Sequence, residues 1–265
     1  MKIVTWNING VKARLETVKA WLEQSQPDIA CLQEIKSVDE NFPREEFEQL
    51  GYNIETHGQK GFNGVAIFSK LPFDEVNRGL PGDEEDEQAR FIEGVFSVKG
   101  GVLRVVSLYL PNGNPVDEDR KFGYKLRWMD RLHAFAEDRL ALEEPFILAG
   151  DYNVIPMPED CHDPALWEGD ALFRDETRSR FRALANLGLT DALRATSDAV
   201  PAYTFWDYQA GAWPKNNGIR IDHLMCSPEA TAKLQKVDIE KDVRGWEKPS
   251  DHVPVAGYFN YARMG

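Results

Sequence analysis

Polar side chains of a restricted kind follow the apolar, strand-like runs of this sequence. Glu34 follows one run, Asp151 ends another, Asp222 follows a third, and Asp251 and His252 stand together near the C-terminus. Strand ends and the loops after them are where a rigid scaffold presents chemistry. The full set comprises Asn7, Asn9, Glu34, Tyr109, Asn112, Asp151, Asn153, Asp222, Asp251 and His252. A single Asp or Asn before a turn usually caps a backbone group, so the prediction of a site depends on the number of such residues.

The four carboxylates of this set would repel one another if they clustered without a cation. Mg²⁺ or Mn²⁺, hard ions that prefer oxygen ligands, would remove the repulsion. His252 beside carboxylates could titrate near pH 7, and the amides of Asn7 and Asn153 could hold phosphate oxygens or orient a carboxylate. These residue types suit metal-assisted phosphoryl transfer to water. The alternative for His252 is a structural histidine with its hydrogen bonds satisfied.

Alternating strand and helix patterns must position these residues. The first 34 residues predict a strand at 2–6, a helix carrying Leu15, Val18 and Leu22, and a second strand at 29–32. Apolar residues at steps of three or four from Phe122 to Leu140 predict a long amphipathic helix. Further strands are expected at 52–55, 65–69, 91–98, 102–110, 146–149, 203–208, 219–226, 237–239 and 253–259.

The chain has no fixed-period repeat, low-complexity linker or break in composition. We therefore expect one domain over residues 1–265, an α/β layered sandwich with helices flanking two strand-rich halves. No run approaches the ~18 apolar residues of a membrane span, and the N-terminus enters a strand pattern, so membrane and secreted classes are not expected.

Cysteine usage and net charge narrow the classes further. The three cysteines, Cys31, Cys161 and Cys226, lie far apart, which favours neither a disulfide framework nor a zinc cluster and suits a reducing cytoplasm. The net charge of -13 argues against a general nucleic-acid coat protein, because phosphate affinity comes from Lys and Arg. A local basic groove remains compatible with that charge.

Seven short motifs occur in an order that matches a known family. They are TWNING at 5–10, LQEIK at 32–36, GFNGVAI at 61–67, YLPNG at 109–113, GDYN at 150–153, RID at 220–222 and SDH at 250–252. With these motifs the chain closely resembles, nearly from end to end, the exonuclease III type of abasic-site endonuclease within the endonuclease/exonuclease/phosphatase superfamily. The resemblance implies a four-layer α/β-sandwich, two packed mixed sheets flanked by helices, with the site between the sheets.

The resemblance also implies roles for the metal-binding and histidine residues. Glu34 would be the metal-binding carboxylate, and Asp251 a possible second ligand. Asp222 would pair with His252, which sets the tautomer of the imidazole and favours its protonated form. The implied cofactor is Mg²⁺ or Mn²⁺, with one ion or two equally open.

The remaining motif residues would act on the phosphate. Asp151, oriented by Asn7, would be the general base that activates water or the acid that serves the leaving oxygen; whether Asp151 or His252 takes the proton stays open. Asn153 and Tyr109 would contact the scissile phosphate.

Aromatic and apolar residues near the C-terminus indicate the substrate. The YLPNG motif, which includes Asn112, and the segment 204–208 resemble the DNA-repair branch of the superfamily. There Phe205, with Ile219 and Ile221, would line a pocket for a flipped-out sugar that has lost its base. Some bacterial members carry Trp where this chain has Phe205. The alternative is ordinary strand core, which is the favoured interpretation for Trp206.

Basic residues gather in two segments despite the overall acidity. Residues 120–131 hold five Lys or Arg, among them Lys121 and Lys125, and residues 174–182 hold four arginines, among them Arg178. They could form solvated helix faces, but we interpret them as a clamp on the duplex backbone. The acidic remainder should make binding weak and sensitive to salt.

The sequence thus predicts a metal-dependent nuclease that cuts 5′ to abasic sites in duplex DNA, with 3′–5′ exonuclease or 3′-phosphodiesterase activity. The expected partner is duplex DNA with abasic sites or 3′ ends, with no membrane, and the expected state is a monomer. Two alternatives stay open: a phosphatase or phosphodiesterase acting on a small or lipid-borne phosphate, and a catalytically silent DNA-binding module. The unbroken set of polar residues argues against the last.

Overall fold

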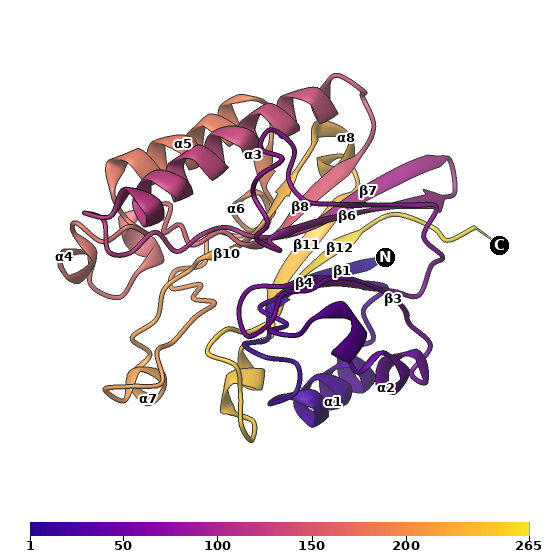
Figure 1. Cartoon of the computed structure of the whole chain (residues 1–265), viewed down its shortest axis with the longest axis horizontal. Helices are drawn as coiled ribbons and strands as arrows, with labels where there is room; N and C mark the ends of the chain where they lie inside the picture. The colour runs from indigo at the N-terminus through magenta and orange to yellow at the C-terminus, as the bar shows by residue number, and fades with distance from the viewer. Residues whose placement is uncertain (265) are drawn as a thin grey trace.

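The computed structural model describes residues 1–264 as two mixed six-stranded sheets packed face to face, with helices on their outer surfaces (Figure 1). The first sheet has the order β11-β12-β1-β2-β4-β3. Its strands are β1 (Lys2–Asn7), β2 (Ile29–Gln33), β3 (Asn53–His57), β4 (Val65–Ser69), β11 (Leu234–Ile239) and β12 (Val255–Phe259). The second has the order β5-β6-β7-β8-β10-β9. Its strands are β5 (Glu75–Arg78), β6 (Phe91–Val98), β7 (Gly101–Tyr109), β8 (Phe146–Asp151), β9 (Thr190–Asp191) and β10 (Asp222–Cys226).

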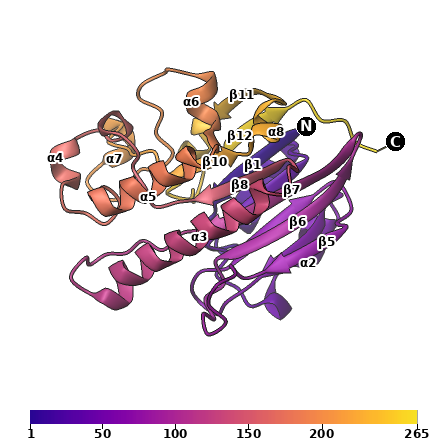
Figure 2. The ribbon, with the colours of Figure 1, turned by 90° about the horizontal axis from the view of Figure 1, so that it is seen from above.

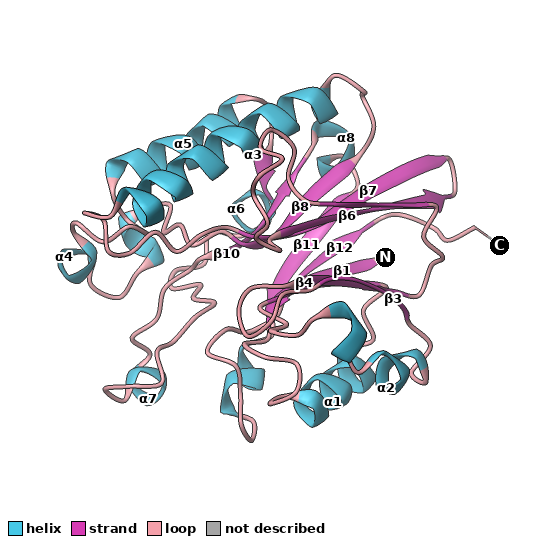
Figure 3. Cartoon of the chain, viewed as in Figure 1, coloured by secondary structure: helices cyan, strands magenta, loops and turns pink. Residues whose placement is uncertain are grey.

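Apolar side chains on both faces of the central strands explain why the sheets are covered on both sides. Along β8, Ile147 and Ala149 join the core between the two sheets, whereas Phe146 and Leu148 face the outer helices. This alternation follows from the two-residue period of a strand. The architecture is therefore the expected four-layer α/β-sandwich, with its strands between two helical layers (Figure 3).

Two pairs of helices form most of the outer layers. Helices α1 (Leu15–Ser25) and α2 (Arg44–Glu48) cover the first sheet, and α3 (Tyr124–Leu140) and α5 (Asp175–Asn186) cover the second. Seen from above, α3 and α5 lie side by side (Figure 2). The shorter helices are α4 (Pro164–Trp167), α6 (Ala192–Thr196), α7 (Ala212–Lys215) and α8 (Pro228–Thr231), with helical turns at Asp39–Asn41, Asp119–Gly123, Pro158–Asp160 and Lys241–Gly245. Within residues 1–264, no helix combines the length and hydrophobicity needed to cross a bilayer.

Most of the predicted elements form close to their expected bounds, and one segment differs. The predicted strand at 203–208 is not formed. Phe205 instead makes isolated bridges with Ile219 on one side and His252 on the other. The backbone of Phe205 exchanges hydrogen bonds with Ile219, while the next residue, Trp206, donates to Asp251. Because the segment changes partners from one residue to the next, it cannot extend a ladder, and it ties the loops around the site together.

Candidate active site

The ends of the two central parallel strand pairs meet at one end of the sandwich. In the first sheet, β1 and β2 run parallel, and Asn7 and Glu34 lie at their carboxyl ends. In the second, β7 runs parallel to β8, with Tyr109 paired to Asp151. Strand β10 is antiparallel to β8, and its first residue, Asp222, is paired to Asp151. The topology therefore gathers residues that are far apart in the sequence.

Two of the residues that follow these strands have unusual backbone conformations. Glu34 has φ +49° and Asn153 has φ +47°, both in the left-handed region that non-glycine residues rarely adopt. Such a conformation costs of the order of 1–2 kcal/mol and is typical of functional sites.

The Asn7 side chain links the two sheets at this site. Its Nδ2 donates to Glu34 Oε1 and to Asp151 Oδ2, both at 2.9 Å, and its Oδ1 accepts from the Asn9 backbone at 3.0 Å. Asn7 is fully buried. The predicted orientation of Asp151 by Asn7 is thus present, and the same amide also orients Glu34.

His252 lies between two buried carboxylates. Its Nδ1 lies 2.9 and 3.1 Å from the two oxygens of Asp222, and its Nε2 lies 3.6 Å from Asp151 Oδ2. Burial alone would lower the pKa of His252, but Asp222 and Asp151 outweigh burial and raise it to about 10. The imidazole is therefore protonated at neutral pH, donates to Asp222 from Nδ1, and directs a second N–H toward Asp151.

The pKa of Asp151 is also raised, but for a different reason. Burial raises its pKa to about 7, although the charge of His252 and the hydrogen bond from Asn7 act in the other direction. Its Oδ1 accepts from the Asn153 backbone at 3.0 Å. A carboxyl group that titrates near neutral pH beside an imidazolium is suited to exchanging a proton with water.

Three side chains bring potential metal-ligand atoms close together, although the protonated imidazole of His252 has no lone pair to offer an ion. One ligand atom from each of Glu34, Asp151 and His252 lies within 4.8 Å of the others. The Lys36 ammonium lies 3.2 Å from Glu34 Oε2. Burial would raise the pKa of Glu34, but its partners Asn7 and Lys36 keep that pKa below its usual value. Glu34 is thus an ionised oxygen donor, as a hard divalent ion requires. Asp251 lines the same pocket but does not belong to this group of three.

Tyr109, Asn112 and Asn153 line the second-sheet side of the pocket. Burial and the negative charges of Glu34 and Asp151 raise the pKa of Tyr109 well above its usual value, so its hydroxyl keeps its proton. The Arg90 guanidinium stacks on its ring, 4.9 Å from the centroid. The Asn153 amide donates to the Leu110 carbonyl at 2.7 Å, which holds the side chain in place.

An apolar wall closes the other side of this pocket, whose volume is about 370 Å³. Phe205, Ile219 and Ile221, which the family resemblance places around a sugar pocket, all line it. The Phe205 ring meets the His252 ring edge to face, with centroids 5.0 Å apart. Trp206 is completely buried and does not line the pocket, so its assignment to the core is confirmed.

Sequence reasoning missed several lining residues. Asn114, Trp167, Asp170 and Leu172 contribute to the same pocket. Asp170 accepts from the Asn114 amide at 3.2 Å, which joins the loop after β7 to the loop after α4. Asn114 lies in the loop after β7 and the other three lie in the proline-bearing stretch after β8, and in neither segment did a periodic pattern distinguish them.

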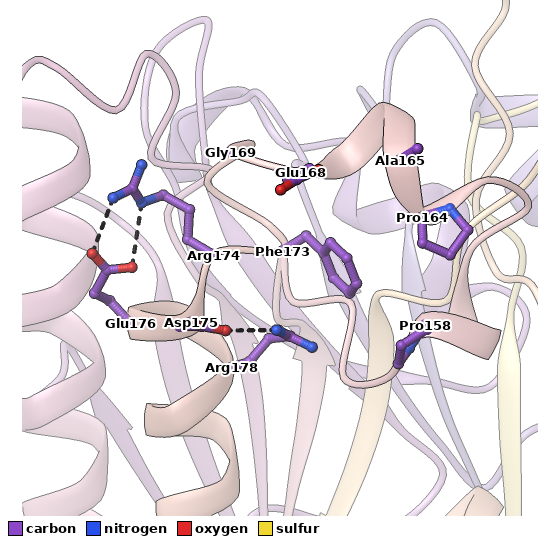
Figure 4. A pocket seen from close by; sticks show the side chains of 10 residues that line it. All are labelled: Pro158, Pro164, Ala165, Glu168, Gly169, Phe173, Arg174, Asp175, Glu176 and Arg178. Atoms are coloured by element: carbon purple, nitrogen blue, oxygen red, sulfur yellow. Dashed lines mark hydrogen bonds and ion pairs between the residues drawn. The ribbon is translucent and has the colours of Figure 1, made fainter.

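The two basic segments are largely neutralised by their own acidic neighbours. Lys121 is 44% exposed and lies 3.9 Å from Glu118. Arg178 pairs with Asp175 at 2.6 Å, and its guanidinium stacks on Phe173, 4.4 Å from the ring centroid. Figure 4 shows Arg178 in a second pocket of about 700 Å³, lined also by Pro158 and Pro164 and others, rather than in the catalytic one.

Lys125 was expected to contact the DNA backbone, and that prediction is wrong. The side chain is 0% exposed, and its Nζ donates to the backbone carbonyls of Asn112 and Asn153. Helix α3 turns this residue toward the second sheet, where the loops after β7 and β8 cover it. A phosphate outside the protein cannot reach this ammonium group.

At its strand ends the two-sheet α/β sandwich gathers a paired histidine, a carboxyl group of raised pKa and an ionised glutamate, an arrangement suited to metal-dependent phosphodiester hydrolysis. Comparison with known proteins agrees with this class. The chain belongs to the Endonuclease/Exonuclease/phosphatase family, whose model matches residues 4–252.

Relatives match the chain over nearly its whole length. It is 35% identical to exodeoxyribonuclease III of Haemophilus influenzae, over 98% of this chain and 100% of that protein. Among solved structures, an AP endonuclease from Archaeoglobus fulgidus is 33% identical with a TM-score of 0.92, covering 98% of this chain and 99% of the other. The 3′ phosphatase NExo from Neisseria, bound to a product DNA hairpin, is 36% identical with a TM-score of 0.93, with the same coverage.

Proposed function

We propose that this chain is a Mg²⁺-dependent DNA-repair nuclease, with Mn²⁺ as the alternative ion. It hydrolyses the phosphodiester 5′ to abasic sites in duplex DNA and removes nucleotides or blocking groups from 3′ ends. The observation that carries the proposal is the Asp151–His252–Asp222 arrangement beside Glu34, in a pocket with one apolar wall. The relatives named as an exodeoxyribonuclease, an AP endonuclease and a 3′ phosphatase support the same substrate class.

Asp151 and His252 perform the proton and charge steps. Asp151, held by Asn7 and by the Asn153 backbone, accepts the proton of the attacking water. The His252 imidazolium, kept charged by Asp222, directs its Nε2–H to a phosphate oxygen whose negative charge grows in the transition state. Tyr109, which keeps its proton, donates to the same phosphate group.

Glu34 holds the divalent cation, with Asp251 as the candidate second ligand. The ion, when bound, neutralises charge on the phosphate and leaving oxygen. The carboxylate is prepared for this role because Asn7 orients its Oε1. Lys36 supplies positive charge on the opposite oxygen at 3.2 Å, which limits repulsion between Glu34 and Asp151.

The pocket wall selects the substrate. Phe205, Ile219 and Ile221 form an apolar surface next to the catalytic histidine, where a deoxyribose without its base can be accommodated. An abasic nucleotide has already lost its stacking, so extruding it costs least. Asn112 at the rim, together with Lys121 and Arg178 farther out, contacts the duplex backbone.

A single domain over residues 1–265 carries this activity, and we propose that it acts as a monomer in the cytoplasm. The three cysteines are buried and unpaired, which suits a reducing compartment. Light scattering of the purified protein at catalytic and micromolar concentrations would test the oligomeric state.

One assay tests the central proposal. A labelled duplex with a single abasic analogue is incubated with Mg²⁺, with Mn²⁺ and with excess EDTA, and the products are sized on a gel. We expect a cut 5′ to the analogue, shortening from 3′ ends, and no product in EDTA. Hydrolysis of an inositol phosphate without cleavage of the duplex would overturn the assignment to DNA, and metal-independent binding of duplex without turnover would favour a silent binding module.

A further inference from the structure

Lys125 is a completely buried lysine directly beneath the catalytic pocket. Its Nζ donates to the Asn153 carbonyl at 2.6 Å and to the Asn112 carbonyl at 3.0 Å. Lysine ordinarily extends its ammonium group to water, because burying a cation costs several kcal/mol. A lysine at this buried position is therefore expected to make an interaction that an apolar side chain cannot make.

Within residues 1–264, Lys125 forms no ion pair, so its partners are the two carbonyls alone. Burial lowers its pKa to about 7, and the more distant charges of Asp151 and Asp170 only partly offset this effect. A neutral amine still has two N–H groups and an ammonium has three. Both hydrogen bonds are therefore available in either protonation state.

The two carbonyls belong to the two loops that carry the phosphate-contacting residues. Asn112 follows β7 and Tyr109, whereas Asn153 follows β8 and Asp151. The loop also packs closely on the lysine, since Gly113 has φ +89° and a Cβ built there would lie 2.6 Å from Lys125 Cδ. The loop after β7 thus closes directly over the stem of the lysine.

We propose that Lys125 is a positioning residue for the hydrolysis: it ties the Asn112 and Asn153 carbonyls to one nitrogen and so sets the spacing of the loops that hold Tyr109 and Asp151. Its nitrogen hydrogen-bonds neither Glu34 nor Asp251, and it does not line the pocket. The inference rests on the proposed nuclease function, and it adds a determinant of turnover that lies outside the pocket lining.

Comparison of Lys125→Met with Lys125→Arg distinguishes a role in positioning the two loops from a role in packing. Methionine keeps an apolar stem of similar length without N–H donors, while arginine keeps donors but fits the buried site less well. We expect Met to lower kcat on the abasic duplex about 10- to 100-fold, since small misplacements of a site can cost that much. KM should change less than about 3-fold, and Arg should retain more kcat than Met although it is the less stable variant.

Leu132→Ala is the matched control, because Leu132 is also fully buried on α3 but belongs to the core against the second sheet. It should lose about 2–5 kcal/mol of stability and keep kcat within about 2-fold at a temperature where all variants are folded. Amide hydrogen exchange supplies a readout besides activity: exchange at 110–114 and 152–154 should rise in Lys125→Met and stay unchanged in Leu132→Ala.

Full kcat in Lys125→Met, or an equal loss in Leu132→Ala, would overturn the positioning role. A higher kcat for Met than for Arg would do the same, because it would show that packing alone matters. Failure of the wild-type protein to cut any DNA would instead count against the proposed function. The hydrogen-exchange comparison would still decide whether Lys125 holds the two loops.

Discussion

Replacing Asp222 by Asn tests the charge state on which the proposed chemistry depends. The pKa of His252 is raised from 6.5 to about 10, equivalent to about 5 kcal/mol in favour of the imidazolium. Asp222, with its oxygens 2.9 and 3.1 Å from Nδ1, is the largest contributor to the rise. An Asn keeps the shape and removes the charge, and it also permits the wrong tautomer.

The loss in turnover should be of the order of 10²–10⁴-fold, by analogy with other histidines oriented by a carboxylate. Because burial lowers the pKa of an unpaired His252, the imidazolium should be lost at lower pH in Asp222→Asn than in the wild type. Activity of the variant should therefore fall on the alkaline side at a lower pH.

The assay is kcat/KM on the abasic duplex from pH 5 to 10, with His252 titrated in parallel by NMR in metal-free buffer. Asp191→Asn is the control, since Asp191 pairs with Arg220 at 2.9 Å, not with His252. It should leave the pH–rate profile unchanged. An Asp222→Asn enzyme with the wild-type profile and the wild-type His252 titration would refute the pairing.

The pH dependence of the unfolding free energy provides an independent check, because the pKa shift of His252 fixes the direction in which stability changes. Because the folded-state pKa of His252 lies above its ordinary value, its contribution to stability is complete below pH 6.5 and is lost as pH rises through about 10. The difference in unfolding free energy between wild type and Asp222→Asn should follow that window, and urea titrations at pH 6 and pH 10 would measure it.

Three other substitutions address the metal, the pocket and the DNA contact. Glu34→Gln should raise the Mg²⁺ concentration for half-maximal activity and lower turnover, as metal titrations would show; full wild-type activity in excess chelator would contradict any metal role. Phe205→Ala should lower kcat/KM on the abasic duplex about 10-fold and reduce the ratio of kcat/KM for the abasic duplex to that for the intact duplex. The metal dependence should stay unchanged, because the substitution removes only part of the pocket wall. An equal loss on both duplexes would mean that Phe205 serves only core packing. Lys121→Ala should weaken all duplexes about equally and reduce the salt slope by about 1 in binding titrations, and lesion-dependent weakening would disprove a backbone contact.

Much of the site could be predicted because its residues lie where strands end. The apolar run at 29–32 and the spacing of three to four in 122–140 locate the elements, and Glu34 and Asp151 stand next to the strand ends. The pairing of Asp222 with His252 came from resemblance to the family, and the distances agree with it. Strand 203–208 was predicted wrongly because its aromatic and Thr content suits any extended backbone, whether or not a ladder forms.

Lys125 was predicted wrongly, and Trp167 and Leu172 were not predicted at all, for the same physical reason. Lys125 was interpreted as an exposed cation because it lies among other basic residues, but its burial depends on two loops distant in sequence that close over it. Trp167 and Leu172 reach the pocket only because the stretch after β8 folds back beside Asn114. Neither the burial of Lys125 nor the return of this stretch to the pocket produces a periodic pattern in the sequence.

Local sequence was sufficient for most of the elements, the layered α/β class and the identity of the residues with catalytic potential. These follow from backbone geometry and side-chain chemistry, which act between near neighbours. Tertiary structure alone established that Asn7 bridges Glu34 and Asp151, that His252 lies between two carboxylates, and that Lys125 lies beneath the pocket. Distances between segments, and the desolvation that shifts each pKa, exist only once the two sheets have packed.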